Sequence, residues 1–420
     1  MKRLLQLVKN QKNIIVIFAL VFLNKAEAQT IHILFDATKA EMAGNADWVI
    51  DADQTNVKFG PNAYTVSGSG FQSNPQITPT PAQSGISSTT AETYWTGALS
   101  SWAVDCVNKG YVVTTLPYNG HITYGDVTNA QDLTHYEIFV IDEPNMQFTA
   151  TEKTAIVKFV QNGGGLFMIA DHNVSDRNSD GWDSPHVWND LLSTNSIQAY
   201  PFGFYFDTVD FSQTTTNISA TATDSIIHGT AGNVTKVQWA GGTTMTLQPT
   251  LNSTVKGVVY KTGTTPGNTN CMVAYSRFGL GKVVTMGDSS PADDSTGNPT
   301  CTLYNGYWTD AAGNHRKLIM NMTIWLATRT GSNSVSDVVD QNEEISIYPN
   351  PAQGTTNLLA LQDMENTTVN ILNTTGSIVY SKNNLKLNKD EKLSIELLPG
   401  FYIVHINNGK SSVSRKILVY

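Results

Sequence analysis

The chain has 420 residues, a net charge of −9 at pH 7 and 40% hydrophobic residues. The acidic balance argues against binding through phosphate contacts, so we do not expect nucleic acid as a partner. Three cysteines without CxxC spacing exclude a disulfide framework and a thiolate zinc cluster, while a single bridge between Cys271 and Cys301 is compatible with an oxidising compartment.

Residues 1–28 have the features of a signal peptide. Basic residues precede an apolar run at 14–23, and Ala26-Glu27-Ala28 has the A-x-A form of a cleavage site. The apolar run is too short for a stable membrane anchor, and no later segment is a transmembrane candidate. We therefore expect export through the periplasm and no transmembrane segment after signal removal.

The next elements alternate between strand and helix. Residues 31–35 predict a strand ending at Asp36, and 53–90, rich in Gly, Ser, Thr and Pro, predict a surface excursion. Apolar residues at spacings of three and four predict a helix over 91–108, followed by a strand at 111–116.

A strand–helix–strand crossover unit follows. The apolar, β-branched run 138–141 is typical of a strand buried on both faces of a parallel sheet. Thr149 and Glu152 have capping-box spacing ahead of an amphipathic pattern. Glycines at 163–165 end that helix, and 166–170 predict the second strand.

The rest of the main domain predicts a mixture of elements. Ser184 as N-cap, with Pro185 at the first helical position, predicts a helix running to about Leu192. The threonine-rich segment 196–262 suggests an antiparallel insertion or edge. After it, a hairpin is predicted over residues 272–286 and a last helix over residues 315–328. Residues 29–328 thus predict a Rossmann-like α/β domain, with a mostly parallel sheet and helices on both faces.

A polar linker is expected at 329–342, and short strands over 343–420 predict a small β-sandwich. Within it, Tyr348-Pro349-Asn350-Pro351, the segment 398–404 and Lys416-Ile417-Leu418-Val419 stand out. These motifs resemble the type A sorting domain of the type IX secretion system. The resemblance implies that residues 343–420 engage the secretion machinery and that the protein is secreted or attached to the outer surface.

The main domain resembles the class I glutamine-amidotransferase-like fold, in particular its ThuA-like branch. The resemblance rests on the segment 141–144 (IDEP), the glycines at 163–165, His172 just beyond the following strand, and a late turn at 224–229. True amidotransferases carry a cysteine nucleophile at a strand-to-helix elbow. Here the strand ends in Ala170-Asp171-His172-Asn173, so glutamine hydrolysis through a thioester is excluded.

Candidate catalytic residues follow the predicted strands, where ligands of open parallel sheets bind. Two carboxyls in different environments can act as acid and base. The alternative is that about half of these acids merely cap turns or helices. The candidates are His172, Asp171, Glu143, Asp36 and Asp288.

The loop after residue 170 also carries candidate substrate-binding and metal-binding residues. The candidates for substrate binding are Trp182, His186 and Arg177, together with His228 from the late turn at 224–229. The candidate ligands of a divalent cation (Ca, Mg, Mn or Zn) are Asp171, His172, Asp176 and Asp180. The alternative is an Asp-rich loop whose side chains cap their own turns. No nucleotide cofactor is expected.

These observations predict a secreted hydrolase that acts on an extracellular polymer, and among such polymers they favour a polysaccharide. They leave open whether a metal ion assists the hydrolysis. One alternative is a non-catalytic glycan-binding or surface adhesion protein on the same fold. A further alternative is a metal-dependent nuclease or phosphoesterase, which the acidic charge disfavours.

Overall fold

The chain divides into two compact units, Met1–Thr330 and Gly331–Tyr420. The computed structural model describes residues 30–43, 46–51, 82–90, 94–95, 97–221, 223–294, 304, 306–308, 313–328, 345–373, 377–408 and 412–420. The expected signal peptide 1–28, the linker 329–342 and most of the 53–90 excursion lie outside these residues.

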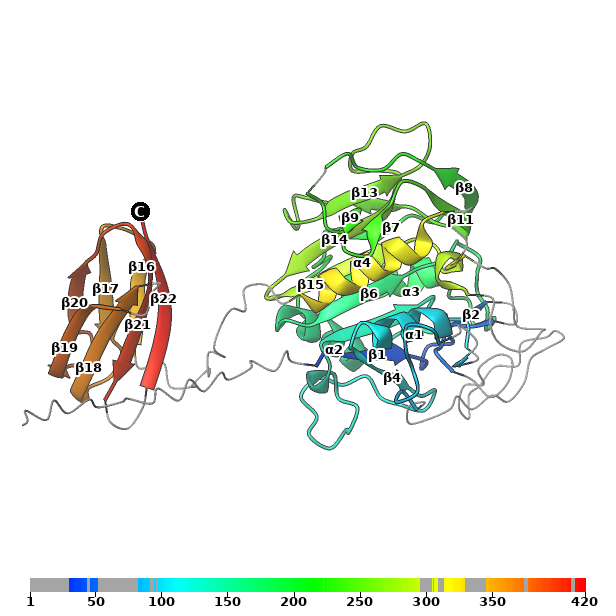
Figure 1. The fold of residues 1–420 in the computed structure, drawn as a ribbon. Helices are drawn as coiled ribbons and strands as arrows, with labels where there is room; N and C mark the ends of the chain where they lie inside the picture. The colour runs from blue at the N-terminus through cyan, green and yellow to red at the C-terminus, as the bar shows by residue number, and fades with distance from the viewer. Residues whose placement is uncertain are drawn as a thin grey trace, which may run out of the picture. The chain divides into compact units, whose positions relative to one another are not determined.

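The larger unit is built on a sheet that has nine strands within the described residues (Figure 1). Its parallel part runs in the order β4-β1-β5-β6-β15. These strands are β1 (His32–Asp36), β4 (Val112–Leu116), β5 (Ile138–Asp142), β6 (Gly165–Ile169) and β15 (Gly281–Met286). In chain order this is 2-1-3-4-5, the flavodoxin-like arrangement, whose ligand crevice lies where the strand order reverses, here between β1 and β5.

Antiparallel strands extend the sheet beyond β15. β14 pairs with β15, β12 with β14, and β7 with β12, while β13 also pairs with β14. They are β7 (Phe204–Phe206), β12 (Met245–Leu247), β13 (Lys256–Tyr260) and β14 (Cys271–Phe278). Shorter ladders join β2 (Met42–Ala43) to β3 (Ala46–Asp47), β8 (Phe211–Thr215) to β11 (Val237–Gly242), and β9 (His228–Gly229) to β10 (Gly232–Asn233). The antiparallel insertion and the late hairpin expected from the sequence are confirmed.

Helices cover both faces of the sheet, which confirms the predicted fold class. α1 (Ser100–Asn108) and α4 (His315–Ala327) contribute to one apolar core, while α2 (Ala150–Gln161) and α3 (Ser184–Thr194) contribute to the other (Figure 1). Successive strand residues point to opposite faces, so Ile138 and Val140 enter the first core and Phe139 and Ile141 the second. This two-sided burial explains the continuous apolar run of β5.

The capping box of α2 is confirmed. The Thr149 hydroxyl accepts from the Glu152 backbone N–H at 3.3 Å, and the Glu152 carboxylate accepts from the Thr149 N–H at 2.8 Å. Gly163 then takes a φ of +114°, a left-handed conformation that suits glycine and ends the helix. Short 3-10 turns lie at Leu133–His135 and Ser290–Ala292.

Two predicted helix starts were wrong. The expected 91–108 helix begins only at Ser100, because Asp294, distant in sequence, accepts from the Ser101 N–H at 2.6 Å and from the Ser100 hydroxyl at 2.9 Å. In α3 the N-cap is Asp183, whose carboxylate accepts from the His186 N–H, and Ser184 is already helical.

The smaller unit has a seven-stranded arrangement in the order β19-β18-β21-β22-β16-β17-β20. Its strands are β16 (Ile345–Gln353), β17 (Thr355–Ala360), β18 (Met364–Asn373), β19 (Ile378–Leu387), β20 (Lys392–Glu396), β21 (Gly400–Asn407) and β22 (Ser412–Val419). Apart from one parallel bridge between Ala352 and Val419, the pairings are antiparallel, and one apolar core unites the strands. In the part of the chain that the structure describes, no helix has the length and apolar character needed to cross a membrane.

Candidate functional site

Glu143, the first residue after β5, is held by three other segments of the chain. Its Oε2 accepts from Trp48 Nε1 at 2.7 Å and from Ser289 Oγ at 2.7 Å, while its Oε1 accepts from Arg177 Nε at 2.8 Å. The residue has a φ of +49°, which is uncommon for a side chain with a Cβ, and it is fully buried. Such strain persists where surrounding contacts determine it, and it is concentrated at functional sites.

Arg177 joins Glu143 to Asp171, the residue that follows β6 and Ala170. Arg177 Nη2 lies 2.6 Å from Asp171 Oδ2, and the Asp171 residue is only 2% exposed. Burial raises the pKa of Asp171 well above its usual value, Glu143 raises it further, and Arg177 opposes both. One guanidinium thus lies between two carboxyl groups at the ends of adjacent strands.

His172 is the partly exposed member of this group. Its Nδ1 lies 2.6 Å from the Asn173 carbonyl oxygen, and its side chain is 19% exposed. A carbonyl oxygen can only accept, so Nδ1 is the donor in this contact. Nε2 lies 3.6 Å from Asp171 Oδ2, and Nδ1 lies 3.7 Å from Asp210 Oδ2.

Asp288 follows β15 and is completely buried. Its carboxylate accepts from the Ala240 N–H at 2.5 Å and from the Ser290 N–H at 2.8 Å. Burial raises the pKa of Asp288 to about 7 despite these bonds. The Asp288 carboxyl therefore titrates near neutral pH although it lies in the protein interior.

Asp36 ends β1 and pairs with another acid, Glu41. Asp36 Oδ1 accepts from the Thr38 N–H at 3.1 Å, whereas Asp36 Oδ2 and Glu41 Oε1 are buried without a hydrogen-bond partner among the described residues. Burial raises the pKa of Asp36 to about 6 and raises the pKa of Glu41 as well. The pair lies at the β1 side of the predicted ligand crevice.

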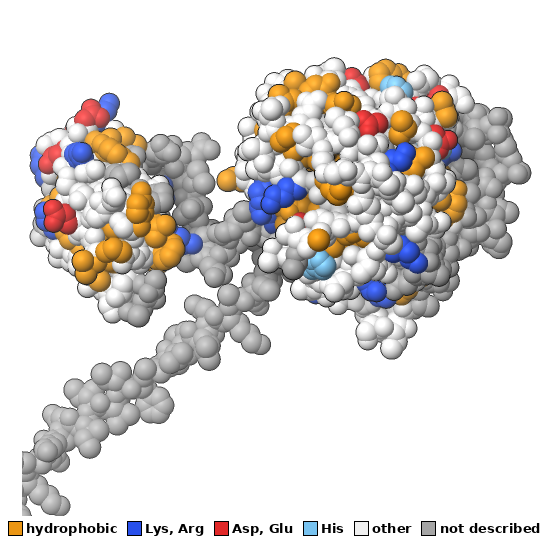
Figure 2. Space-filling view, turned by 90° about the horizontal axis from the view of Figure 1, so that it is seen from above, with side chains coloured by type: hydrophobic (Ala, Val, Ile, Leu, Met, Phe, Trp, Pro, Cys, Tyr) orange, Lys and Arg blue, Asp and Glu red, His pale blue; other side chains and the backbone are white. Residues whose placement is uncertain are grey.

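Asp142, the last residue of β5, is on the other side of that crevice. Asp142 is 1% exposed, and neither of its carboxyl oxygens has a hydrogen-bond partner among the described residues. Burial raises the pKa of Asp142 well above its usual value, and Glu143, Asp288 and Asp293 raise it further. Figure 2 shows the acidic side chains of the face it draws as separate spots rather than as one patch.

The loop after His172 uses its acids mainly to stabilise its own turns. Asp176 accepts from the Asp180 and Gly181 N–H groups at 3.2 and 2.7 Å, and Asp180 accepts from the Trp182 N–H at 2.9 Å. This is the turn-capping arrangement expected as the alternative to a metal site. The described residues contain no group of three or more acidic, His or Cys side chains placed to hold a metal ion, so Asp171, His172, Asp176 and Asp180 do not form one shell.

The candidate substrate-binding residues lie in different surroundings. His186 Nδ1 is 2.6 Å from Asp183 Oδ1 at the start of α3, with about half of its side chain exposed. Trp182 is partly buried against the second core. His228 contacts Asn233 across the β9–β10 hairpin, which packs against α4, so nothing places it with Arg177 and His172.

Sequence reasoning missed several members of the site. Asp210 lies far along the chain from its partner His172, and no local pattern marks it, whereas Glu41 follows its partner Asp36 within the same short segment. Asp142 was foreseeable from its place beside Glu143. Tyr304 also lies near the cluster. Burial raises the pKa of its hydroxyl, and the nearby charges of Asp288 and Asp171 raise it further.

The two described cysteines offer no activated nucleophile. Cys106 and Cys271 are buried free thiols, and burial raises the pKa of both. Cys301 lies outside the described residues, and because the Cys271 thiol is free, the bridge between the two that the sequence allowed is not formed.

The C-terminal motif assignment is supported by a family match. Residues 346–420 match the family described as "Secretion system C-terminal sorting domain", which indicates secretion or attachment at the outer surface and interaction with the secretion machinery. No curated protein resembles the chain closely enough to count as a relative.

Solved structures resemble the units only distantly. The "mmIFT52 N-terminal domain" is 14% identical, with 71% of this chain and 98% of that chain covered and a TM-score of 0.42. "Cytoplasmic Protein STM3548 from Salmonella typhimurium" is 11% identical, with 71% and 100% covered and a TM-score of 0.38. PorZ, described as a surface component of the type-IX secretion system of Porphyromonas gingivalis, is 22% identical over 22% of this chain and 13% of its own, with a TM-score of 0.16. At these values the likenesses support no inference about activity.

Proposed function

We propose that residues 29–328 form a secreted hydrolase of an extracellular polysaccharide, on an amidotransferase-like fold that works without a thiol. The observation that carries the proposal is the placement of His172. Its Nδ1 lies 2.6 Å from the Asn173 carbonyl oxygen, and its partly exposed ring carries Nε2 on the side of the buried acid Asp171. A neutral imidazole held in this way is suited to remove a proton from water or from a sugar hydroxyl through Nε2.

Asp171 and Arg177 complete the proposed reaction centre. Asp171 lies 3.6 Å from Nε2, close enough for its charge to stabilise the imidazolium that forms when Nε2 takes the proton. Arg177, with 27% of its side chain exposed, offers positive charge to an oxygen that becomes negative in the transition state. These roles need no group beyond the chain's own residues.

The remaining candidate acids have supporting roles in this proposal. Glu143, Asp36 and Asp288 are at most 2% exposed, so they do not touch a polymer directly. Glu143 orients Arg177 through the 2.8 Å contact. Asp288 lies close enough to Asp171 to raise the pKa of that acid, and burial raises the pKa of Asp288 itself to about 7.

Trp182 and His186 are the proposed substrate-side residues. Both lie on the loop and helix start that follow His172, and both retain exposed surface. An aromatic ring can pack against the apolar face of a sugar. Export to the cell exterior, where polysaccharides are abundant substrates, supports this substrate class by analogy only.

Metal assistance remains a separate prediction. Its test is the metal content of purified wild type and an Asp171→Ala variant, measured by mass spectrometry after exchange into metal-free buffer. Metal bound by wild type and missing from the variant would support it. Equal content in both proteins would reject Asp171 as a ligand, and with it the two-metal phosphoesterase alternative.

A second candidate, a non-catalytic glycan-binding protein, is favoured by a specific observation. Several of the acids are engaged in contacts that also make sense as structure, such as Asp288 with two backbone N–H groups. In that case acid substitutions leave glycan binding unchanged, whereas Trp182→Ala abolishes it.

The proposal is tested by release of reducing ends from a panel of polysaccharides. Wild type, His172→Ala and the matched control His121→Ala, an exposed histidine on another loop, are run in parallel. Release by wild type and control that disappears in His172→Ala supports the hydrolase. Binding to one polymer by all three proteins without release from any polymer contradicts it and favours the glycan-binding protein.

A further inference from the structure

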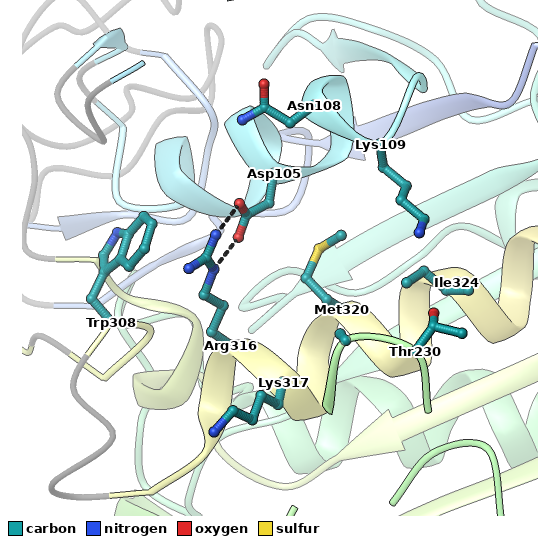
Figure 3. Close-up of a pocket in the computed structure, with 10 residues that line it drawn as sticks. Asp105, Asn108, Lys109, Thr230, Trp308, Arg316, Lys317, Met320 and Ile324 are labelled. Carbon is teal, nitrogen blue, oxygen red and sulfur yellow. Dashed lines mark hydrogen bonds and ion pairs between the residues drawn. The ribbon is translucent and has the colours of Figure 1, made fainter. Parts of the chain in front are cut away.

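The cavity lined by α1 and α4 offers no group that acts on His172. It has a volume of about 440 Å³, and Figure 3 shows Arg316 reaching from α4 to its ion-pair partner Asp105 on α1. The described residues that line it include neither His172 nor the acids and the carbonyl oxygen that contact His172. The loop that carries His172 itself contains such a group.

A hydrogen-bonded peptide bridge joins His172 to the start of α3. His172 Nδ1 lies 2.6 Å from the Asn173 carbonyl oxygen, and the N–H of the next residue, Val174, donates to Asp183 Oδ2 at 2.8 Å. This carbonyl and this N–H belong to one peptide group, and in a trans peptide they point in opposite directions. His172 and Asp183 are therefore connected through the two sides of the Asn173–Val174 peptide.

The two oxygens of Asp183 have separate partners. Oδ1 accepts from the His186 backbone N–H at 3.1 Å as the N-cap of α3, and it lies 2.6 Å from His186 Nδ1. A helix cap needs one such oxygen. Oδ2 instead reaches back along the chain to the Val174 N–H, and the side chain is only 8% exposed, so water competes little for this contact. Capping of α3 therefore does not account for the Oδ2 contact.

The backbone of Val174 is held in an uncommon conformation. Its φ is +61°, an outlier for a β-branched residue, and the residue is 77% exposed, so packing of its side chain does not stabilise this conformation. The backbone contacts do, since the Val174 N–H binds Asp183 and the Asn173 N–H donates to the Val209 carbonyl oxygen at 3.1 Å. Strain of this kind persists where surrounding contacts determine it, and it is concentrated at functional sites.

The His172 ring is confined on its other edge as well. A Cβ at Gly241 would lie 3.3 Å from His172 Cδ2 and 3.8 Å from Nε2, so the glycine leaves just enough room for the ring. On the Nδ1 side, a carboxylate that accepts from the peptide N–H polarises the peptide and makes its carbonyl oxygen a better acceptor. The two sides together fix the plane of the ring.

We propose that Asp183 is a positioning residue for His172. It holds the Asn173–Val174 peptide, whose carbonyl oxygen orients the ring through Nδ1 and leaves Nε2 to act on the substrate. The role of Nε2 rests on the proposed hydrolase function, whereas the orientation of the ring can be measured without hydrolysis.

The test separates the peptide bridge from the helix cap. Asp183→Asn keeps one side-chain oxygen that can cap α3 but replaces the other by an NH2 group, which cannot accept from the Val174 N–H. Val174→Pro breaks the bridge from the other side, because proline has no N–H and fixes a negative φ. Val174→Gly keeps the N–H and tolerates a positive φ. The control is Ser184→Ala, which removes from the same helix start a hydroxyl without a hydrogen-bond partner among the described residues.

The readout is the proton–nitrogen correlation spectrum of the intact protein with isotope-labelled histidine, recorded at mildly alkaline pH. The shifts of the two ring nitrogens show which of them carries the proton, and the signals missing from His172→Ala identify His172. We expect the proton on Nδ1 in wild type, Val174→Gly and Ser184→Ala, and loss of this preference in Asp183→Asn and Val174→Pro. On the polymer found in the panel, these last two variants should lose up to about 10²-fold in kcat with KM unchanged, the effect of misplacing a reacting group.

The spectra decide the proposal whether or not hydrolysis is found. A preference for Nδ1 that persists in both Asp183→Asn and Val174→Pro overturns it, as does an equal loss in Ser184→Ala. A wild-type ring that carries its proton on Nε2 overturns it as well. If wild type releases no reducing ends from any polymer, the hydrolase proposal fails while the spectra still report the orientation of His172, so the two proposals fail separately.

Discussion

Arg177 and Glu143 form an ion pair below the surface, with Nε 2.8 Å from Oε1. The contact joins the loop after β6 to the end of β5, and the same guanidinium reaches the acid after β6. The site is therefore organised around one cation between two carboxyl groups, in a cluster otherwise rich in acids.

Removing that cation should destabilise the larger unit. Arg177→Gln leaves the buried Glu143 and Asp171 without their positive partner, which costs about 3–5 kcal/mol when one member of a buried pair is deleted. Arg177→Lys keeps the charge but not the forked geometry and should lose less. Urea unfolding at pH 7.5 measures both, with the exposed Lys158→Gln as control. A loss below about 0.5 kcal/mol, the usual effect of a surface change, contradicts this structural role.

The Asp36–Glu41 pair predicts a dependence of stability on pH. The pKa of Asp36 is about 6 in the folded state and near 3.8 in the unfolded chain, so between these values the folded state binds more protons. Its contribution to stability is therefore complete below about pH 4 and is lost as pH rises through 6. Asp36→Asn cannot ionise and can donate its amide to Glu41, so it should weaken this dependence and raise stability at pH 8.

Urea unfolding at pH 5 and pH 8 tests that prediction. The difference in the free energy of unfolding between the two pH values should be smaller in Asp36→Asn than in wild type. Asp126→Asn, at an exposed acid whose pKa is lowered by hydrogen bonds to Thr128, provides a contrast at a group whose pKa is shifted in the opposite direction. An unchanged pH difference in Asp36→Asn would contradict the raised pKa of Asp36.

The capping box of α2 makes a smaller, local contribution. Thr149→Ala removes the hydroxyl that accepts from the Glu152 N–H, and loss of such a cap costs about 1 kcal/mol. Thr149→Ser keeps the hydroxyl and should remain close to wild type. If thermal or urea unfolding shows equal losses for Ala and Ser, the hydroxyl is not the stabilising group.

The buried thiols predict a pattern of chemical labelling. Iodoacetamide should modify neither Cys106 nor Cys271 in the folded protein, because burial blocks access and raises the pKa of both thiols. After denaturation without reductant, peptide mass spectrometry should find both modified. Labelling of Cys271 in the folded state contradicts its burial, and an unlabelled Cys271 after denaturation would reveal a bridge to Cys301.

The sequence predicts the framework of the fold better than the site. The apolar run of β5 and the Thr149 cap are local patterns with few competing structures, and both are confirmed. The start of α1 depends instead on Asp294, nearly two hundred residues away, so periodicity alone placed it too early. The same limit applies to the site, because strand ends could be predicted whereas the partners that reach them from distant loops, such as Asp210, could not.

Chemical rescue of His172→Ala is the most direct test of the central claim, that His172 Nε2 acts as a base on a polysaccharide. Using the polymer found in the panel, reducing-end release is followed with and without added imidazole. The account predicts a fall of about 10²–10⁴-fold in the variant, the usual contribution of a general base, and partial recovery with imidazole but not with an equal concentration of a non-basic salt. Release by His172→Ala at the wild-type rate would contradict the assignment.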